Sequence, residues 1–256
     1  MSSSIMKPHT SYIICAVQRS GSSLLCEALK NTGLAGFPEE YFLDAHLENG
    51  EWARKNHVST RADYMRFVLD KGTSPNGVFG AKIMWNYFHL TIDKLSALPA
   101  YENLSAPQIM MALFQNVHFI WMVRRDKVRQ AVSWAKAAQT DIYAWHKGKA
   151  PIPKQDPSFD FTFIDNLHKL ILEGEAGWRS FFDACGEEPI KVIYEDLIED
   201  YEGTALRILD TLKIPYHKDL QFGERRLQRQ GDALNDSWVE QYNLMKLQTG
   251  VNDPSV

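Results

Sequence analysis

The sequence predicts an α/β fold in which helices flank a mostly parallel central sheet. Four short segments are apolar along most of their length, as strands buried on both faces are: residues 11–17, 77–84, 118–123 and 189–194. Helix-patterned sequence separates each segment from the next, which is the alternation typical of a parallel sheet. The 256 residues, 45% of them apolar, suit one large domain or two small ones, and we expect a single domain over residues 1–256.

The elements follow in order from local patterns. The first strand leads into a small polar turn over residues 18–22 and then into a helix over residues 23–32, which Gly33 ends. The clearest helix covers residues 126–145, where apolar residues recur every three or four positions and Asp126 caps the start. Residues 161–185 and 201–212 also have helical spacing. Residues 36–76 and 147–160 interrupt the pattern, and we expect lids or substrate loops there, with a disordered connection as an equal alternative for the second.

Composition and charge exclude several classes of function. Lys and Arg total 28 against 32 Asp and Glu, and the net charge of −4 argues against a nucleic-acid-binding protein. The three cysteines are too few for a disulfide framework or a zinc site, and the histidines show no metal spacing, so we expect no metal. Residues 1–10 lack the apolar core of a signal peptide, and polar residues interrupt the uncharged stretch 103–123, so no transmembrane segment is expected. A cytoplasmic location is the expectation.

The turn after the first strand has the composition of an anion-binding loop. Consecutive backbone N–H groups and the positive end of the next helix attract an anion, and glycine lets it approach closely. The side chains add hydroxyl donors and one fixed charge; the residues concerned are Gln18, Arg19, Ser20, Gly21, Ser22 and Ser23. The Gly-Lys-Ser/Thr ending of a Walker A loop is missing, which disfavours an NTPase. A serine-rich capped turn without a ligand is the alternative interpretation.

A second anion signal follows the strand at 118–123. Arg124 and Arg125 come directly after this strand, and Ser133 lies on the helix that Asp126 begins. Two helical turns span about 10 Å, so a long arginine and the Ser133 hydroxyl can converge on one phosphate. An ordinary salt-bridged helix start with a solvent-facing serine is the alternative. Two strand ends with separate anion sites suit a nucleotide that carries phosphates at both ends of its ribose.

Several segments, in order, resemble the sulfotransferases and closely the bacterial trehalose 2-sulfotransferase family. They are AVQRSGSSLLCEAL, TGLAGFPEEYF, NGVFGAKIMWN, RRDKVRQAVSW and RQGDALNDSWVEQY, and they span nearly the whole chain. The resemblance implies a sulfotransferase fold related to the P-loop NTPases and 3′-phosphoadenosine 5′-phosphosulfate (PAPS) as donor, which leaves 3′-phosphoadenosine 5′-phosphate (PAP). It implies that the first loop binds the phosphosulfate and that Arg125 and Ser133 bind the 3′-phosphate. Many sulfotransferases have lysine where this chain has Arg19, so neutralisation of the leaving group is expected to be electrostatic.

The resemblance also implies the remaining site residues. Glu40 of PEEYF is the expected general base, with Glu39 at the variable position; a surface carboxylate is the alternative. A lysine inside an apolar strand is costly unless it meets an anion, so Lys82 is expected to face the sulfate or the acceptor, or else to extend to solvent from an edge strand. Trp85 and Asn86 suit a sugar, although Trp85 alone is more often a core residue. Tyr194 is expected near the nucleotide and Arg229 in a segment that closes over it.

Three functional classes follow from these motifs. The first is a PAPS-dependent enzyme that sulfates a carbohydrate or glycolipid hydroxyl, with trehalose as a candidate acceptor and a homodimer as the assembly that the family implies. The second is a small-molecule kinase, which needs magnesium ligands and a P-loop lysine that are not evident. The third is a non-catalytic nucleotide-binding protein that has kept the fold.

Overall fold

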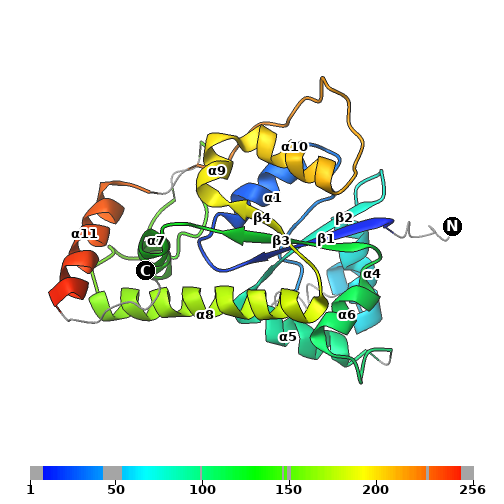
Figure 1. Cartoon of the computed structure of the whole chain (residues 1–256), viewed down its shortest axis with the longest axis horizontal. Helices are drawn as coiled ribbons and strands as arrows, with labels where there is room; N and C mark the ends of the chain where they lie inside the picture. The colour runs from blue at the N-terminus through cyan, green and yellow to red at the C-terminus, as the bar shows by residue number, and fades with distance from the viewer. Residues whose placement is uncertain are drawn as a thin grey trace.

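The structure is a computed structural model that describes residues 8–42, 54–98, 100–145, 147–148, 151–228 and 231–248. Four parallel strands form a sheet in the order β2-β1-β3-β4 (Figure 1). The strands are β1 (Thr10–Ala16), β2 (Val78–Met84), β3 (Val117–Val123) and β4 (Ile190–Ile193). Each bound lies within one residue of the sequence-based expectation, so the predicted α/β class and its strands are confirmed.

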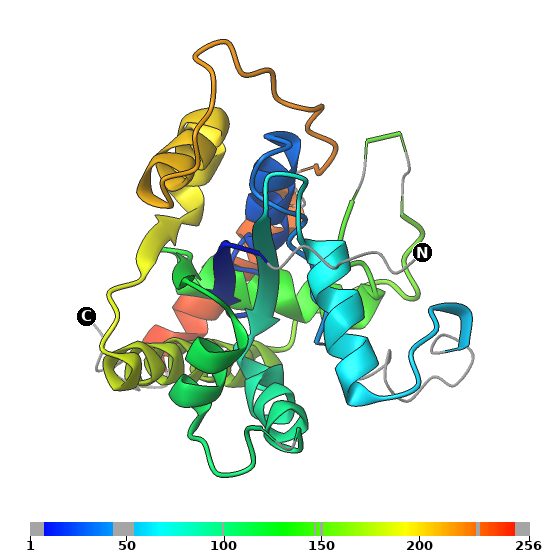
Figure 2. The ribbon, with the colours of Figure 1, turned by 90° about the vertical axis from the view of Figure 1, so that its right-hand side faces the viewer.

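Helices cover both faces of the sheet (Figure 2). One face packs against α1 (Ser22–Asn31), α9 (Tyr194–Glu199) and α10 (Tyr201–Thr211). The other face packs against α4 (Arg61–Gly72), α5 (Trp85–Ser96), α6 (Ala106–Leu113), α7 (Lys127–Thr140) and α8 (Phe161–Cys185), and α11 (Ala233–Gln248) joins this layer. β1 and β2 are buried along their whole length, as strands covered on both faces must be.

The strand order determines where a ligand site forms. From β1 the chain passes to β2 on one side, and β3 later pairs with the other side of β1. At such a reversal the connections leave in opposite directions and open a crevice beyond the carboxyl ends of the strands. The loop that follows β1 therefore lies at the mouth of this crevice.

The indole of Trp178 fixes the end of β1 just before that loop. Trp178 is fully buried on α8, and its Nε1–H donates to the Ala16 carbonyl at 2.9 Å. A buried indole N–H costs free energy unless it is hydrogen-bonded, and here the partner is the last carbonyl of the strand. Aromatic packing around Trp178 thus holds the strand end that presents the loop.

The structure differs from the sequence-based expectation in two connecting regions. α7 ends at Thr140, five residues before the predicted end, because Asp141 adopts a left-handed conformation with φ 61°. The predicted excursion over residues 36–76 contains α4, whose start carries a capping box between Thr60 and Asp63. Residues 151–160 form neither helix nor strand, but the Lys154 N–H donates to the Thr140 carbonyl at 2.9 Å and so ties this segment to α7.

The C-terminal helix α11 is attached to α8 through one carboxylate. Asp165 on α8 accepts hydrogen bonds from the Tyr242 hydroxyl at 2.8 Å and from Lys246 at 2.6 Å, and it pairs with Lys169 at 2.8 Å. Burial alone would raise the pKa of Asp165, but these donors outweigh burial and hold the pKa well below its usual range. Among the described helices, none has the length and apolarity that a membrane-spanning segment needs.

Candidate functional site

A cavity of about 650 Å³ lies beyond the carboxyl ends of the strands. That volume falls within the usual range for a small-molecule site, about 300–1,000 Å³. Its lining comes from the loop after β1, from β2, from α7 and from segments near the C-terminus. The residues are Gln18, Arg19, Gly21, Ser22, Ser23, Leu24, Glu40, Lys82, Met84, Tyr87, Arg124, Arg129, Ser133, Tyr143, Ala144, Tyr194, Ile198, Glu199, Arg225, Leu227, Gln228, Gly231 and Asn235.

The loop over residues 18–23 joins β1 to the start of α1 and includes a glycine with positive φ. Gly21 is the residue before α1, with φ 94°, a conformation that L-residues rarely adopt. A Cβ at Gly21 would lie 2.3 Å from Cδ2 of Tyr194, so the close approach also requires glycine. The first N–H groups of α1 have no carbonyl four residues earlier within the helix, and they are suited to an anion. Ser20 is fully buried and is not part of the cavity lining.

Arg19 connects this loop to two other parts of the cavity. Its Nε donates to Ser133 Oγ at 3.1 Å, and one of its terminal nitrogens donates to the Tyr143 carbonyl at 2.6 Å. Burial lowers the pKa of Arg19 to about 10, and the positive charge of Arg124 contributes to the shift. The guanidinium remains charged at neutral pH, and burial and a neighbouring like charge make it a favourable partner for an anion.

The two arginines after β3 have different surroundings. Arg124 lines the cavity, its side chain is 12% exposed, and its guanidinium lies 4.8 Å from the centre of the Tyr194 ring. Arg125, which the sequence analysis pairs with Ser133, is not part of the lining. Its side chain is 55% exposed and donates to both carboxylate oxygens of Asp196, at 2.6 and 2.9 Å. The structure therefore does not bring Arg125 and Ser133 together in the cavity.

Glu40 and Lys82 form an ion pair inside the cavity. Lys82 Nζ lies 2.6 Å from Glu40 Oε1 and donates to Ser23 Oγ at 3.2 Å. The lysine side chain is only 6% exposed. Burial by itself would lower the pKa of Lys82, but neighbouring Cys26 and Glu40 outweigh it, so the pKa is raised and the ammonium stays charged. The pair places a carboxylate next to the anion loop, with a cation between them.

Glu39 and Glu40 point to different environments. Glu39 is 56% exposed and forms an ion pair with Lys30 on the surface, whereas the Glu40 side chain is 29% exposed and belongs to the cavity. The backbone sets this separation, because the Lys82 N–H donates to the Glu39 carbonyl at 2.9 Å and binds the segment to the edge of β2. The distinction between the two carboxylates expected from the sequence therefore has a geometric basis.

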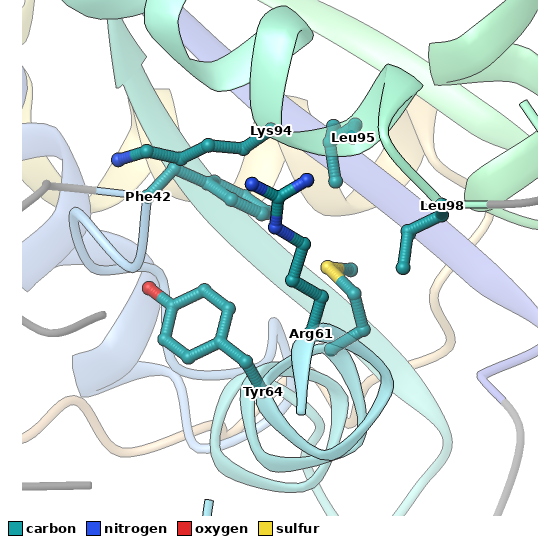
Figure 3. A pocket seen from close by; sticks show the side chains of 7 residues that line it. Phe42, Arg61, Tyr64, Lys94, Leu95 and Leu98 are labelled. Atoms are coloured by element: carbon teal, nitrogen blue, oxygen red, sulfur yellow. The ribbon is translucent and has the colours of Figure 1, made fainter. Parts of the chain in front are cut away.

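Phe42 anchors the same segment from its other end. Its side chain is 7% exposed and lines a small second cavity between α4 and α5, which Figure 3 shows with the residues around it. Tyr64 and Leu95 contribute to this lining, and the Phe42 ring meets Phe114 edge to face at 6.3 Å. Glu40 thus lies between a backbone hydrogen bond on one side and a buried aromatic anchor on the other, which fixes the carboxylate in place.

Of the residues predicted to face the acceptor, Glu40 and Lys82 line the cavity, whereas Trp85 and Asn86 do not. Trp85 packs in the core against Phe88 and Trp178, with ring centres 5.6 and 5.3 Å apart, so the core alternative describes it. The exposed Asn86 accepts a hydrogen bond from Gln18, which does line the cavity. Tyr194 lies in the lining. Arg229 lies outside the described residues.

A strap over residues 222–228 contributes to the cavity wall, and sequence reasoning missed its role. It supplies Arg225, Leu227 and Gln228 to the lining. Glu27 on α1 holds it, because one carboxylate oxygen accepts hydrogen bonds from the backbone N–H groups of residues 226 and 227 at 2.8 and 3.1 Å. The closely spaced arginines of this segment were the available signal, but surface arginines are common and their spacing shows no period.

The described residues contain no group of three His, Cys, Asp or Glu side chains that could hold a metal ion. Cys15 and Cys26 are buried, and burial raises the pKa of the Cys26 thiol to about 11. Both thiols therefore stay protonated at neutral pH and act as core side chains. The charged groups that the cavity itself offers are guanidinium, ammonium and carboxylate groups.

The amino-acid sequence of the chain matches a known family. The family model described as Stf0 sulphotransferase matches residues 11–244, and the chain belongs to that family. It is a sulfotransferase.

The chain is also similar to two named relatives and to one solved structure. The chain is 29% identical to a trehalose 2-sulfotransferase of Mycobacterium tuberculosis over an alignment of 258 positions, gaps included, which covers 90% of this chain and 93% of the relative. It is also 29% identical to a trehalose 2-sulfotransferase of Mycolicibacterium smegmatis over an alignment of 262 positions, which covers 91% of this chain and 94% of the relative. The sulfotransferase domain of a Synechococcus olefin synthase aligns with a TM-score of 0.45 at 16% identity, over 100% of this chain and 93% of that domain.

Proposed function

We propose that the protein transfers a sulfuryl group from PAPS to a carbohydrate hydroxyl, with Glu40 as the general base. The observation that carries this proposal is the Glu40–Lys82 pair, which places a carboxylate and a buried cation beside the anion loop in one cavity. PAPS supplies the activated sulfuryl group. Trehalose is the first acceptor to test because both mycobacterial relatives are named for it; other glycosides and glycolipids follow.

The residues of the cavity suit the charges of this donor. Arg19 and the N–H groups at the start of α1 would hold the phosphosulfate end. Ser133, with an arginine that follows β3, would hold the 3′-phosphate, and Tyr194 would lie beside the nucleotide. Because arginine is a poor proton donor, Arg19 would neutralise the leaving phosphate by charge alone.

The reaction then needs one proton acceptor and a fixed geometry. The acceptor oxygen forms a bond to sulfur as the bond between sulfur and the leaving phosphate oxygen breaks, and Glu40 takes the hydroxyl proton. Lys82 holds the Glu40 carboxylate in position and adds positive charge next to the transferring group. The products are the sulfate ester, PAP and one proton.

The decisive experiment is an acceptor screen read by mass spectrometry. The full chain is incubated with PAPS and with trehalose, other disaccharides and a detergent-dispersed glycolipid, and each acceptor is examined for the added mass of SO3. Turnover should survive excess EDTA. Turnover with magnesium-ATP in place of PAPS, or an absolute need for a divalent ion, would instead support the kinase alternative.

Two further properties complete the proposal. We infer a homodimer, which the resemblance implies, and a cytoplasmic location, which the composition of the chain suggests. Neither enters the mechanism above. Sedimentation equilibrium would test the first, and fractionation of cells that express the protein would test the second.

A further inference from the structure

Lys82 contacts two oxygen atoms that come from different segments of the cavity wall. Its Nζ lies 2.6 Å from Glu40 Oε1 and donates to Ser23 Oγ at 3.2 Å. Ser23 is the second residue of α1, and all three side chains belong to the cavity lining. A carboxylate, an ammonium and a hydroxyl group therefore form a row, with the buried ammonium in the middle.

The hydroxyl proton of Ser23 is directed away from Lys82. An ammonium group has donors only, so Ser23 Oγ is the acceptor in this contact and its own proton is available to another group. A hydroxyl that accepts from a cation becomes a stronger donor. Ser22 differs, because its Oγ donates to Met84 Sδ at 3.9 Å and the residue is 5% exposed. Ser23 is exposed, so it is the serine of this pair that offers a proton to the cavity.

The row is short enough to serve both ends of one sulfuryl transfer. Because Lys82 Nζ contacts both Glu40 Oε1 and Ser23 Oγ, these two oxygens are separated by no more than the sum of the two distances. In an in-line transfer, the acceptor oxygen and the leaving oxygen lie on opposite sides of one sulfur atom. Under the proposed function Glu40 faces the acceptor, and Ser23 lies in the first turn of α1, where the leaving phosphate would be held.

Arg19 supplies charge at this end of the cavity but not a proton. Its guanidinium stays charged at neutral pH, and arginine is a poor proton donor. Its Nε and one terminal nitrogen donate to Ser133 and to the Tyr143 carbonyl. An ammonium group releases a proton more readily than a guanidinium does, and Lys82 is an ammonium in contact with the loop. Charge and proton can therefore come from two different cations.

We propose that Ser23, backed by Lys82, is the proton donor to the leaving phosphate oxygen. The inference deepens the proposed function and rests on PAPS being the donor. As the acceptor oxygen bonds to sulfur, its proton passes to Glu40; as the bond between sulfur and the leaving oxygen breaks, Ser23 gives its proton to that oxygen. Lys82 replaces the Ser23 proton and receives the proton that Glu40 took. All three groups end as they began, and PAP leaves with the proton of the acceptor hydroxyl.

The first test compares the rate of the transfer step with PAP affinity in the full chain. Ser23→Ala should lower the single-turnover rate at least about 10²-fold, as loss of a general acid does. Isothermal titration should show PAP weakened by less than about tenfold, the effect of one neutral hydrogen bond. Ser23→Thr keeps the hydroxyl and should recover most of the rate. Lys82→Arg keeps the charge without a readily released proton, so it should be slow with PAP affinity near that of wild type.

Two further measurements report on the row itself. In mixtures of H2O and D2O, the single-turnover rate of wild type should fall along a curve because several protons move together, whereas Ser23→Ala should give a straight line. Nitrogen-15 NMR of the lysine side chains needs no donor: the Lys82 signal, identified by its absence from Lys82→Arg, should shift in Ser23→Ala. Ser22→Ala is the matched comparison, and it should keep the curved dependence and shift the Lys82 signal less.

Several outcomes would overturn the proposal. A rate loss in Ser23→Ala no larger than its loss of PAP affinity would make Ser23 a phosphate ligand alone. A straight line for wild type, an unmoved Lys82 signal in Ser23→Ala, or wild-type turnover in Lys82→Arg would remove the proton transfer. If thermal melting shows that Lys82→Arg is unfolded, the Ser23 variants and the isotope measurement decide. A wild-type protein that transfers nothing from PAPS to any acceptor would refute the proposed function rather than the contact between Lys82 and Ser23.

Discussion

Glu40→Gln tests whether the Glu40 carboxylate takes a proton, because the substitution changes the shape of the cavity very little. Glutamine has nearly the size of glutamate and keeps one carbonyl oxygen where Glu40 Oε1 now lies, 2.6 Å from Lys82 Nζ. The buried ammonium therefore keeps a hydrogen-bond acceptor, but the side chain can no longer take a proton. Removal of a general base lowers the rate by about 10²- to 10⁴-fold, which corresponds to about 3–5 kcal/mol in the transition state.

The assay compares kcat with nucleotide affinity for two adjacent residues. Steady-state turnover is measured with PAPS and the acceptor that the screen identifies, and PAP binding is measured separately. Glu40→Gln should lower kcat by the factor above with PAP affinity within a few-fold of wild type. The matched control is Glu39→Gln, which removes only a surface pair with Lys30 and should change kcat less than about threefold. Equal effects from the two substitutions, or a loss of PAP binding alone in Glu40→Gln, would refute the assignment of the base.

Three further substitutions test how the cavity and the fold are held. Gly21→Ala should abolish PAP binding and lower the melting temperature, because the new Cβ would meet the Tyr194 ring at 2.3 Å in a backbone conformation that alanine disfavours; unchanged PAP titrations would contradict this. Glu27→Ala frees the strap and should raise KM for PAPS severalfold with kcat nearly unchanged, while Glu27→Gln, which keeps an acceptor oxygen, should recover most of the loss. Asp165→Asn should destabilise the protein at pH 7 by about 1–3 kcal/mol. The pKa of Asp165 is lower in the folded protein than in the unfolded chain, so wild type should lose this advantage as the pH falls from about 4 toward the folded-state pKa. Urea unfolding at several pH values would show whether the stabilities of wild type and Asp165→Asn converge at low pH.

The fold was predictable because its signals are local and redundant. Each strand is a short apolar run between helix-patterned segments, and burial on both faces leaves few other structures for such a run. The end of α7 was not predictable in this way. Apolar spacing continues to Trp145, but the left-handed turn at Asp141 ends the helix, and the Trp145 carbonyl accepts a hydrogen bond from the Gln228 N–H of the strap instead. A contact between residues so distant in the chain produces no periodic pattern in the sequence from which it could be predicted.

The site was predictable where one residue type meets a strict local requirement. A glycine in a polar turn and a lysine within an apolar strand are both conspicuous in the sequence, so Gly21 and Lys82 were singled out there, Lys82 with the resemblance deciding its expected role. The structure gives Gly21 a positive φ and places Lys82 beside Glu40. Trp85 and the choice between Arg124 and Arg125 depend on which way a side chain turns at the end of a strand. For Trp85, small residues on α8 determine that the ring turns into the core, because they leave room for it: a Cβ on Gly177 would lie 2.0 Å from the indole. Motif spacing contains no information about such neighbours.

The arrangement of charges explains how an acidic chain can hold a polyanion. The net charge is −4, yet the cavity wall brings Arg19 and Arg124 together, and the carboxylate oxygen of Glu195 lies 3.9 Å from Arg124 Nε. Burial and mutual repulsion both disfavour these charges, which is why the pKa of Arg19 falls to about 10. A bound phosphate or sulfate relieves the repulsion and supplies the counter-charge at once. Under the proposed function, the like charges that oppose folding are the groups that would favour the nucleotide, and selection for donor affinity would work against selection for stability at these two positions.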